Sequence, residues 1–113
     1  MAVTLVKSDN GSFQQLTITS GETGTKWIKC SPGRYIKFGV NTGHGATYDV
    51  VTQLGDPEAL DYSGTAISPT TYTESSGETA GYAGKFNPGM KQIGINITGA
   101  PSSDLIIELA EGK

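Results

Sequence analysis

Apolar and polar residues alternate with a period of two in several short runs of this chain. The alternation is clearest over residues 35–40, 46–50, 92–97 and 105–109. Successive side chains of a β-strand point to opposite faces, so each run predicts a strand with one buried face. The expected core positions are Ile36, Phe38, Val40, Ala46, Tyr48, Val50, Ile93, Ile95, Ile97, Leu105, Ile107 and Leu109.

Weaker runs predict further strands. They cover residues 3–7, 16–19, 26–30, 71–73 and 82–86, and each is flanked by Gly, Ser, Asn or Pro, which end strands and form turns. The pattern therefore predicts an all-β chain of about eight short strands.

The chain also matches itself at an offset of 56 residues, with nine identities in the 24 positions from Ser20 to Gly43. Ser20–Thr23 falls on Ser76–Thr79, and Pro32-Gly33 falls on Pro88-Gly89. We interpret this as two similar four-stranded halves, residues 13–53 and 69–109, that share the same turns. Each Pro-Gly pair predicts a type II turn, because proline presets φ at the first central position and glycine accepts a positive φ at the second.

One four-stranded sheet leaves its apolar face in water, whereas two halves packed face to face bury both faces. The sequence thus predicts an antiparallel β-sandwich or jelly roll as a single domain over residues 1–113, with a small closed β-barrel as the alternative. Residues 1–10 are a candidate N-terminal arm. Their β-prone segment, which includes Val3 and Leu5, is suited to add a strand to a partner's sheet.

Composition and charge reduce the number of fold classes and partner classes to consider. Sixteen glycines and 17% charged residues argue against a helical bundle, and a net charge of -3 disfavours nucleic acid as a partner. Charge is also uneven: residues 1–37 carry +3 and residues 38–84 carry -6.

No apolar run approaches the roughly 20 residues that span a membrane, and residues 1–7 do not form a signal-peptide core. A single cysteine excludes an internal disulfide and fits synthesis in a reducing cytoplasm.

Candidate catalytic and metal-binding residues are few. Cys30 and His44 are the only Cys and the only His, so a nucleophilic pair would have to use both, and a buried structural thiol is the favoured interpretation of Cys30. Asp56, Glu58 and Asp61 form an acidic cluster that suits either a calcium site or a solvated loop, without the spacing of an EF-hand. We therefore expect no enzyme activity and no cofactor; a small hydrolase that uses carboxylates is a third alternative.

Aromatic residues are the strongest candidates for binding a partner. Trp27, Arg34 and Tyr35 flank the first Pro-Gly pair, and Tyr62, Tyr72 and Tyr82 are ten residues apart. Such residues anchor protein interfaces and stack on sugars. A spacing of ten is also what successive hairpins produce, so a structural role is an equal interpretation.

A Trp27 strand that leads into Cys30-Ser31-Pro32-Gly33-Arg34-Tyr35, the similar segment from Phe86 to Lys91, and the short acidic Gly/Thr/Ser-rich composition carry a resemblance. The chain resembles the small all-β virion proteins of tailed bacteriophages, especially capsid decoration or cement proteins. The resemblance implies a structural protein that is made in the host cytoplasm and binds the outer capsid surface. Its implied partners are the major capsid protein and copies of itself, as a dimer or trimer, and neither nucleic acid nor a membrane.

A carbohydrate-binding module or a tail- or fibre-associated module is the alternative from another class. In that interpretation Trp27, Tyr35 and the spaced tyrosines form a platform for sugar rings.

Overall fold

The structure, a computed structural model, describes residues 3–7, 12–55 and 60–112. Within them the chain forms nine strands: β1 (Val3–Lys7), β2 (Phe13–Ile18), β3 (Gly24–Lys29), β4 (Tyr35–Val40), β5 (Thr47–Gln53), β6 (Thr71–Glu78), β7 (Tyr82–Phe86), β8 (Gln92–Gly99) and β9 (Leu105–Gly112). Every run that the sequence predicted as a strand contributes to one of them. The described residues include no helix of the length and apolarity that crossing a membrane requires.

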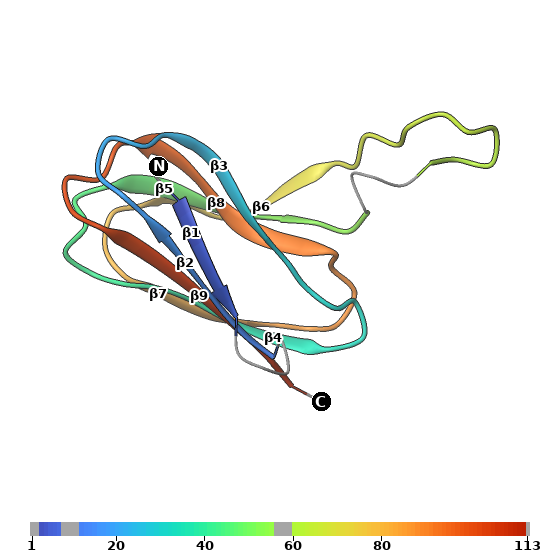
Figure 1. The fold of residues 1–113 in the computed structure, drawn as a ribbon, viewed down its shortest axis with the longest axis horizontal. Helices are drawn as coiled ribbons and strands as arrows, with labels where there is room; N and C mark the ends of the chain where they lie inside the picture. Colours follow the sequence, from blue (N-terminus) through green and yellow to red (C-terminus); the bar gives the residue numbers. More distant parts are fainter. Residues whose placement is uncertain (1–2, 8–11, 56–59, 113) are drawn as a thin grey trace.

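The nine strands form two antiparallel sheets that pack into a β-sandwich (Figure 1). Sheet A has the order β1-β2-β9-β4-β7, and sheet B has the order β3-β8-β5-β6. The two sheets are separate, with β1 and β7 at the edges of one and β3 and β6 at the edges of the other, so the prediction of a sandwich is confirmed and the closed barrel is wrong. From β2 to β9 the chain crosses between sheets in the interleaved order of a jelly roll.

The two segments 13–53 and 69–109 are not the two sheets. The first supplies β2 and β4 to sheet A and β3 and β5 to sheet B, and the second divides its four strands in the same way. The expectation that one half packs face to face on the other is therefore wrong. Most neighbouring strands come from different segments, because the chain changes sheet at most of its connections.

The shared turns also differ. Ser20–Thr23 connects β2 to β3, whereas Ser76, Gly77 and Glu78 lie inside β6, where its pairing with β5 is shifted by a bulge. At the first Pro-Gly pair the N–H of Arg34 donates to the carbonyl of Ser31 at 3.2 Å, which closes a β-turn. Gly33 has no positive φ, so the predicted type II turn is wrong at this pair.

The core lies between the two sheets. All twelve positions that the alternation predicted are buried, and Leu16, Ile18, Ile28, Cys30 and Met90 complete the cluster. Burial of each Ile, Leu, Val or Phe side chain contributes roughly 1.5–3 kcal/mol. Because the inward positions belong to the core, most alternate positions face solvent and form the candidate surfaces of the molecule. The exceptions lie in the two central strands β5 and β8 of sheet B, where Val51, Gln92 and Gly94 are also buried.

Candidate functional site

Exposed apolar side chains gather in the long connection between β5 and β6. Five of the nine large apolar side chains that are exposed in the described part of the chain lie at or between the facing ends of these strands: Leu54, Leu60, Tyr62, Ile67 and Tyr72. We call residues 60–70 the arm. In Figure 1 the arm extends away from both sheets along the longest, 44 Å axis of the molecule.

The tip of the arm is an ordered turn. Leu60 and Ala66 form an antiparallel bridge, and the Asp61 N–H donates to the Thr65 carbonyl at 2.8 Å. The Asp61 carboxylate accepts hydrogen bonds from the N–H and hydroxyl of Ser63 and from the N–H of Thr65, at 2.8 to 2.9 Å. The hydrogen bond from the Ser63 hydroxyl, followed by those from backbone N–H groups, lowers the pKa of Asp61 below its usual value. The turn therefore holds a charged carboxylate beside Tyr62.

Tyr62 is fully exposed at this tip, with a relative accessibility of 106%. Its neighbours Asp61 and Ser63 are fixed by the turn, so the ring is presented on a constrained backbone rather than on a free loop. Large apolar groups of a soluble protein that stay in water at a projecting, ordered turn are typical of surfaces that a partner covers.

The base of the arm is joined to the sandwich. The Gln53 side chain donates to the Thr71 hydroxyl at 2.9 Å and accepts a hydrogen bond from the Gln92 side chain at 2.6 Å. In addition, the Lys91 N–H donates to the Gln53 carbonyl at 2.8 Å. These bonds link the ends of β5, β6 and β8, so the direction in which the arm leaves the sandwich is set by the sheet.

A second exposed apolar region is the edge strand β1. Leu5 and Val6 have relative accessibilities of 46% and 55%, and β1 pairs only with β2. The free edge of such a strand has unpaired backbone groups that another chain's strand can complete. Val3 begins this strand opposite Ile18, while its side chain and residues 8–11 lie outside the described part of the chain.

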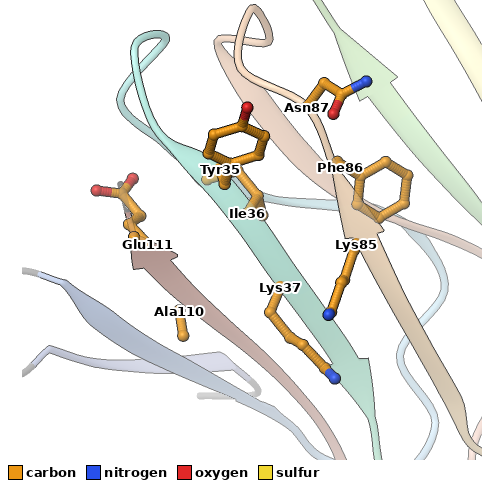
Figure 2. Close-up of a pocket in the computed structure, with 9 residues that line it drawn as sticks. Tyr35, Ile36, Lys37, Lys85, Phe86, Asn87, Ala110 and Glu111 are labelled. Atoms are coloured by element: carbon orange, nitrogen blue, oxygen red, sulfur yellow. The ribbon is translucent and has the colours of Figure 1, made fainter.

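A groove of about 580 Å³ lies on the outer face of sheet A (Figure 2). Ile36 and Phe38 point into the core, so Tyr35 and Lys37 of β4 point outward. Lys85 is the direct cross-strand partner of Lys37, and in Figure 2 both side chains extend toward the space between β4 and β7. The residues that line the groove are Tyr35, Ile36, Lys37, Lys85, Phe86, Asn87, Ala110, Glu111 and Gly112.

The sequence pattern could predict only part of the lining of this groove. The alternation in residues 35–40 places Tyr35 and Lys37 on one outward face, but we did not predict Lys85, Phe86 or Ala110 as site residues. They meet Tyr35 and Lys37 through the β4–β7 and β4–β9 pairings, which join parts of the chain about 50 and 75 residues apart.

The structure separates Trp27 from Tyr35. Trp27 is half-buried on β3, where Ile28 faces the core, so the indole lies on the outer side of sheet B. Tyr35 lies on the outer side of sheet A, with exposed Arg34 just before it in the turn. The two aromatic rings are on opposite faces of the sandwich, so the single sugar platform that the sequence suggested from them does not form.

The three tyrosines at a spacing of ten are also separated. Tyr62 is at the tip of the arm and Tyr72 is the second residue of β6, where it is half-exposed, whereas Tyr82 packs against Phe38 with ring centroids 6.4 Å apart. Burial, and then the carboxylates of Glu74 and Glu78, raise the pKa of Tyr82. Tyr82 is therefore part of the margin of the core, and Tyr62 and Tyr72 are the members of the set that face solvent.

Cys30 and His44 do not form a nucleophilic pair. Cys30 precedes β4 and His44 follows it, so the strand lies between them. The Cys30 thiol is buried and donates to the Met90 carbonyl at 3.5 Å; burial, followed by the nearby Glu111 carboxylate, raises its pKa to about 12. A thiol in this state is a poor nucleophile.

His44 is fully buried in the connection between β4 and β5. Its Nδ1 accepts a hydrogen bond from the Ala46 N–H at 2.9 Å, and its Nε2 lies 3.1 Å from the Ala80 carbonyl. The neutral ring with a proton on Nε2 satisfies both bonds. His44 therefore holds the β4–β5 connection against the β6–β7 connection, a structural role that sequence reasoning missed.

The acidic cluster of the sequence is only partly described. Asp56 and Glu58 lie outside the described residues, and the Asp61 carboxylate is used within its own turn. In the described ranges no group of three or more His, Cys, Asp or Glu residues has the arrangement of a metal site.

Comparison with known proteins gives similarity at the level of structure. No protein-family model matches the chain, and no curated protein matches its sequence. A xylanase of Clostridium thermocellum, solved as its CBM22-1 and GH10 modules with xylohexaose, is similar over 98% of this chain and 24% of its own, at 14% identity and a TM-score of 0.44.

Two proteins of phage origin are also similar in structure. The tailspike protein 4 of bacteriophage CBA120 matches 99% of this chain and 18% of its own at 22% identity and a TM-score of 0.37. The SPBc2 prophage-derived protein YomS matches 88% of this chain and 95% of its own, at 10% identity and a TM-score of 0.45. The chain thus spans less than a quarter of the xylanase and of the tailspike. At these values the similarity carries no argument about activity, ligand or partner, so function is argued from this chain's own residues.

Proposed function

We propose that this chain is a structural protein of a phage virion that binds the outer capsid surface and reinforces contacts between capsid subunits. The observation that carries the proposal is the arm: an ordered turn, joined to a rigid sandwich, that holds Leu60, Tyr62 and Ile67 in water. Tyrosine and large aliphatic residues supply most of the binding free energy where protein surfaces meet. A protein partner at the arm would remove these side chains from water.

The edge strand β1 supports the same proposal. Its exposed Leu5 and Val6 lie at the opposite side of sheet A from β7, and the unpaired edge suits addition of a strand from a neighbouring protein. A chain with two attachment elements, the arm and β1, contacts two neighbours at once, which is what reinforcement of a lattice requires.

The proposal assigns no catalytic step and no cofactor to the chain. Its nucleophile candidate, Cys30, is a buried thiol with a raised pKa, and His44 is occupied by two backbone groups. The net charge of -3 accords with partners that are proteins rather than nucleic acids.

The test is binding to shells. Virions of the phage that encodes this chain are prepared so that they lack the protein. They are then mixed with purified wild-type protein or with Tyr62→Ser, and the bound fraction is measured by co-sedimentation. We expect Tyr62→Ser to weaken binding by about tenfold or more, because loss of an interface anchor costs over 1 kcal/mol. Tyr62→Phe is the matched control and retains binding, since it keeps the apolar ring. Equal binding of wild type and Tyr62→Ser would contradict the role of the arm, and no binding by wild type would contradict the proposed function.

A second candidate function is binding of an oligosaccharide in the groove on sheet A. Exposed Tyr35, beside Phe86 and Asn87, is the observation that favours it, because aromatic faces stack on sugar rings. A glycan array separates the two functions: hits that disappear in Tyr35→Ala would establish a sugar site, whereas no hits together with shell binding would leave the structural function.

A further inference from the structure

Two lysines stand side by side in the groove. Lys37 and Lys85 are direct partners in the β4–β7 pairing, both are exposed, and neither forms an ion pair with any described residue. The Glu111 carboxylate, which also lines the groove, accepts a hydrogen bond from the Ser31 N–H, and Glu108 of the adjoining hollow accepts one from the Gln15 side chain. Like charges directly opposite each other on neighbouring strands destabilise the pairing. An anionic group bound between them would remove this repulsion. A neutral sugar would not.

Apart from Asn87 and Glu111, the other residues of the groove are apolar or aromatic. Tyr35 lies along it, Phe86 borders it while packing against the core, and the small residues Ala110 and Gly112 of β9 leave its floor open. A second hollow of about 200 Å³ shares Lys37 and Ala110 with the groove and continues across Gly39 and Ala83. The surface is therefore a trough across β9, β4 and β7 that fits an apolar side chain next to a carboxylate.

The arm has this combination. At its tip, exposed Tyr62 follows directly after Asp61, whose carboxylate is held in the charged form by the turn. Exposed Leu60 and Ile67 add apolar surface. Residues 38–84 contain six acids and no Lys or Arg, so every charge in and around the arm is negative.

The arm does not occupy the groove of its own chain. It leaves the molecule from the ends of β5 and β6 in sheet B, while the groove is on the outer face of sheet A, and no arm residue lines it (Figure 1). An arm that enters this groove must therefore come from a second molecule.

We infer that the arm of one copy docks in the Lys37/Lys85 groove of the next, with Asp61 between the two ammonium groups and Tyr62 beside Tyr35. The contact joins two different surfaces and is head-to-tail, so repetition of it gives a ring when the rotation closes and an open chain otherwise. The inference rests on the proposed function and deepens it by naming a second copy as the partner of the arm. Tyr62→Ser would then weaken shell binding through the lost contact between neighbouring copies, while the β1 edge contacts the shell.

The test measures self-association without shells, by sedimentation velocity from micromolar to millimolar protein. We expect wild type to associate, with weaker association at high salt because the contact includes opposite charges. Lys85→Glu in the groove and Tyr62→Ser in the arm are each expected to weaken association at least tenfold. Lys29→Glu is the matched control: it makes the same change in net charge, from -3 to -5, on the outer side of sheet B, and it is expected to associate like wild type.

A mixing experiment tests the head-to-tail geometry. Lys85→Glu has an intact arm and Tyr62→Ser has an intact groove, so a mixture of the two is expected to form a one-to-one complex although each alone stays monomeric. All variants change exposed side chains, and circular dichroism confirms that they are folded.

Several outcomes would overturn the inference. They are a monomeric wild type at millimolar concentration, association that either variant leaves unchanged, a Lys29→Glu variant that fails to associate, and a mixture that gives no complex. A monomeric wild type whose Lys85 signals shift with an acidic oligosaccharide would assign the groove to a sugar instead. Shell binding that Tyr62→Ser abolishes, without self-association of wild type, would retain the proposed function and reject only this inference.

Discussion

The Tyr48 hydroxyl and the His44 ring meet at one acceptor: Tyr48 donates to the Ala80 carbonyl at 2.7 Å, and His44 Nε2 lies 3.1 Å from the same oxygen. The two rings are in edge contact, with centroids 5.6 Å apart. Both side chains are fully buried, and their shared acceptor links the β4–β5 connection and β5 to the β6–β7 connection.

Replacing Tyr48 with Phe removes one of the two bonds to Ala80. We expect a loss of about 1 kcal/mol in the free energy of unfolding, because His44 still satisfies the carbonyl. Urea denaturation measures it. Tyr62→Phe removes a hydroxyl from a fully exposed ring and serves as the control, with no change expected; equal stability of wild type and Tyr48→Phe would show that the buried bond adds nothing net.

Alkaline pH is expected to destabilise the fold through two buried groups, Cys30 and Tyr48. Burial raises the pKa of Cys30 from 9.0 and of Tyr48 from 10.0, each to about 12. The unfolded chain therefore releases these protons first, and the stability that both groups contribute is present below pH 9 and lost between pH 9 and 12. Urea unfolding across this range measures the slope. The double variant Cys30→Ala/Tyr48→Phe should have a shallower slope, and an unchanged slope would contradict the assignment.

Gly94 of β8 lies directly opposite Trp27 of the neighbouring strand β3, and a side chain does not fit there. A Cβ at this position would be 2.0 Å from the Lys26 carbonyl oxygen and 3.0 Å from the Trp27 Cα. Gly94→Ala must push the two strands apart, and we expect a loss of about 3–5 kcal/mol or failure to fold.

Gly33→Ala is the control for this substitution. Gly33 has open space around its Cβ position and no positive φ, so a change within about 0.5 kcal/mol is expected. Thermal unfolding of both variants distinguishes a steric effect at residue 94 from a general effect of replacing glycine, and similar melting temperatures would rule out the steric explanation.

The turn at the tip of the arm depends on the charge of Asp61. Its pKa is lowered, so the contribution of the carboxylate is complete above its usual value of 3.8 and is lost as pH falls through the lowered value. We expect the amide NMR signals of Ser63 and Thr65 to shift together at acid pH while core signals stay constant. Asp61→Ala should give the same shifts at neutral pH with unchanged global stability. Signals that stay at their neutral-pH positions would show that the turn forms without the carboxylate.

The arrangement of the strands could be predicted only in part. The apolar–polar pattern indicated all nine strands, but period-two alternation gave the inward faces of only four runs, residues 35–40, 46–50, 92–97 and 105–109. It did not locate the partners: Lys85 meets Lys37 only because β7 pairs with β4. The offset of 56 residues suggested two stacked halves, but strand exchange between the sheets interleaves them.

For the candidate site, the sequence indicated which residues could be exposed, but it did not predict which of them lie together on the surface. Tyr62 was selected by residue type, while Trp27 and Tyr35 were grouped by nearness in the chain and lie on opposite faces. His44 was considered only as a partner for Cys30, whereas its buried ring is the hydrogen-bond partner of the Ala46 N–H and the Ala80 carbonyl.

By itself, the sequence determined the fold class, the core faces of four strands and the uneven distribution of charge, because alternation, turn residues and net charge are properties of the chain. Only the tertiary structure decided that the arm projects with Tyr62 at its tip, and that Lys37 and Lys85 stand together above a floor of small residues. Those features arise where strands that are distant in the sequence pair. Which strands pair depends on which apolar faces pack together, and no single segment specifies that.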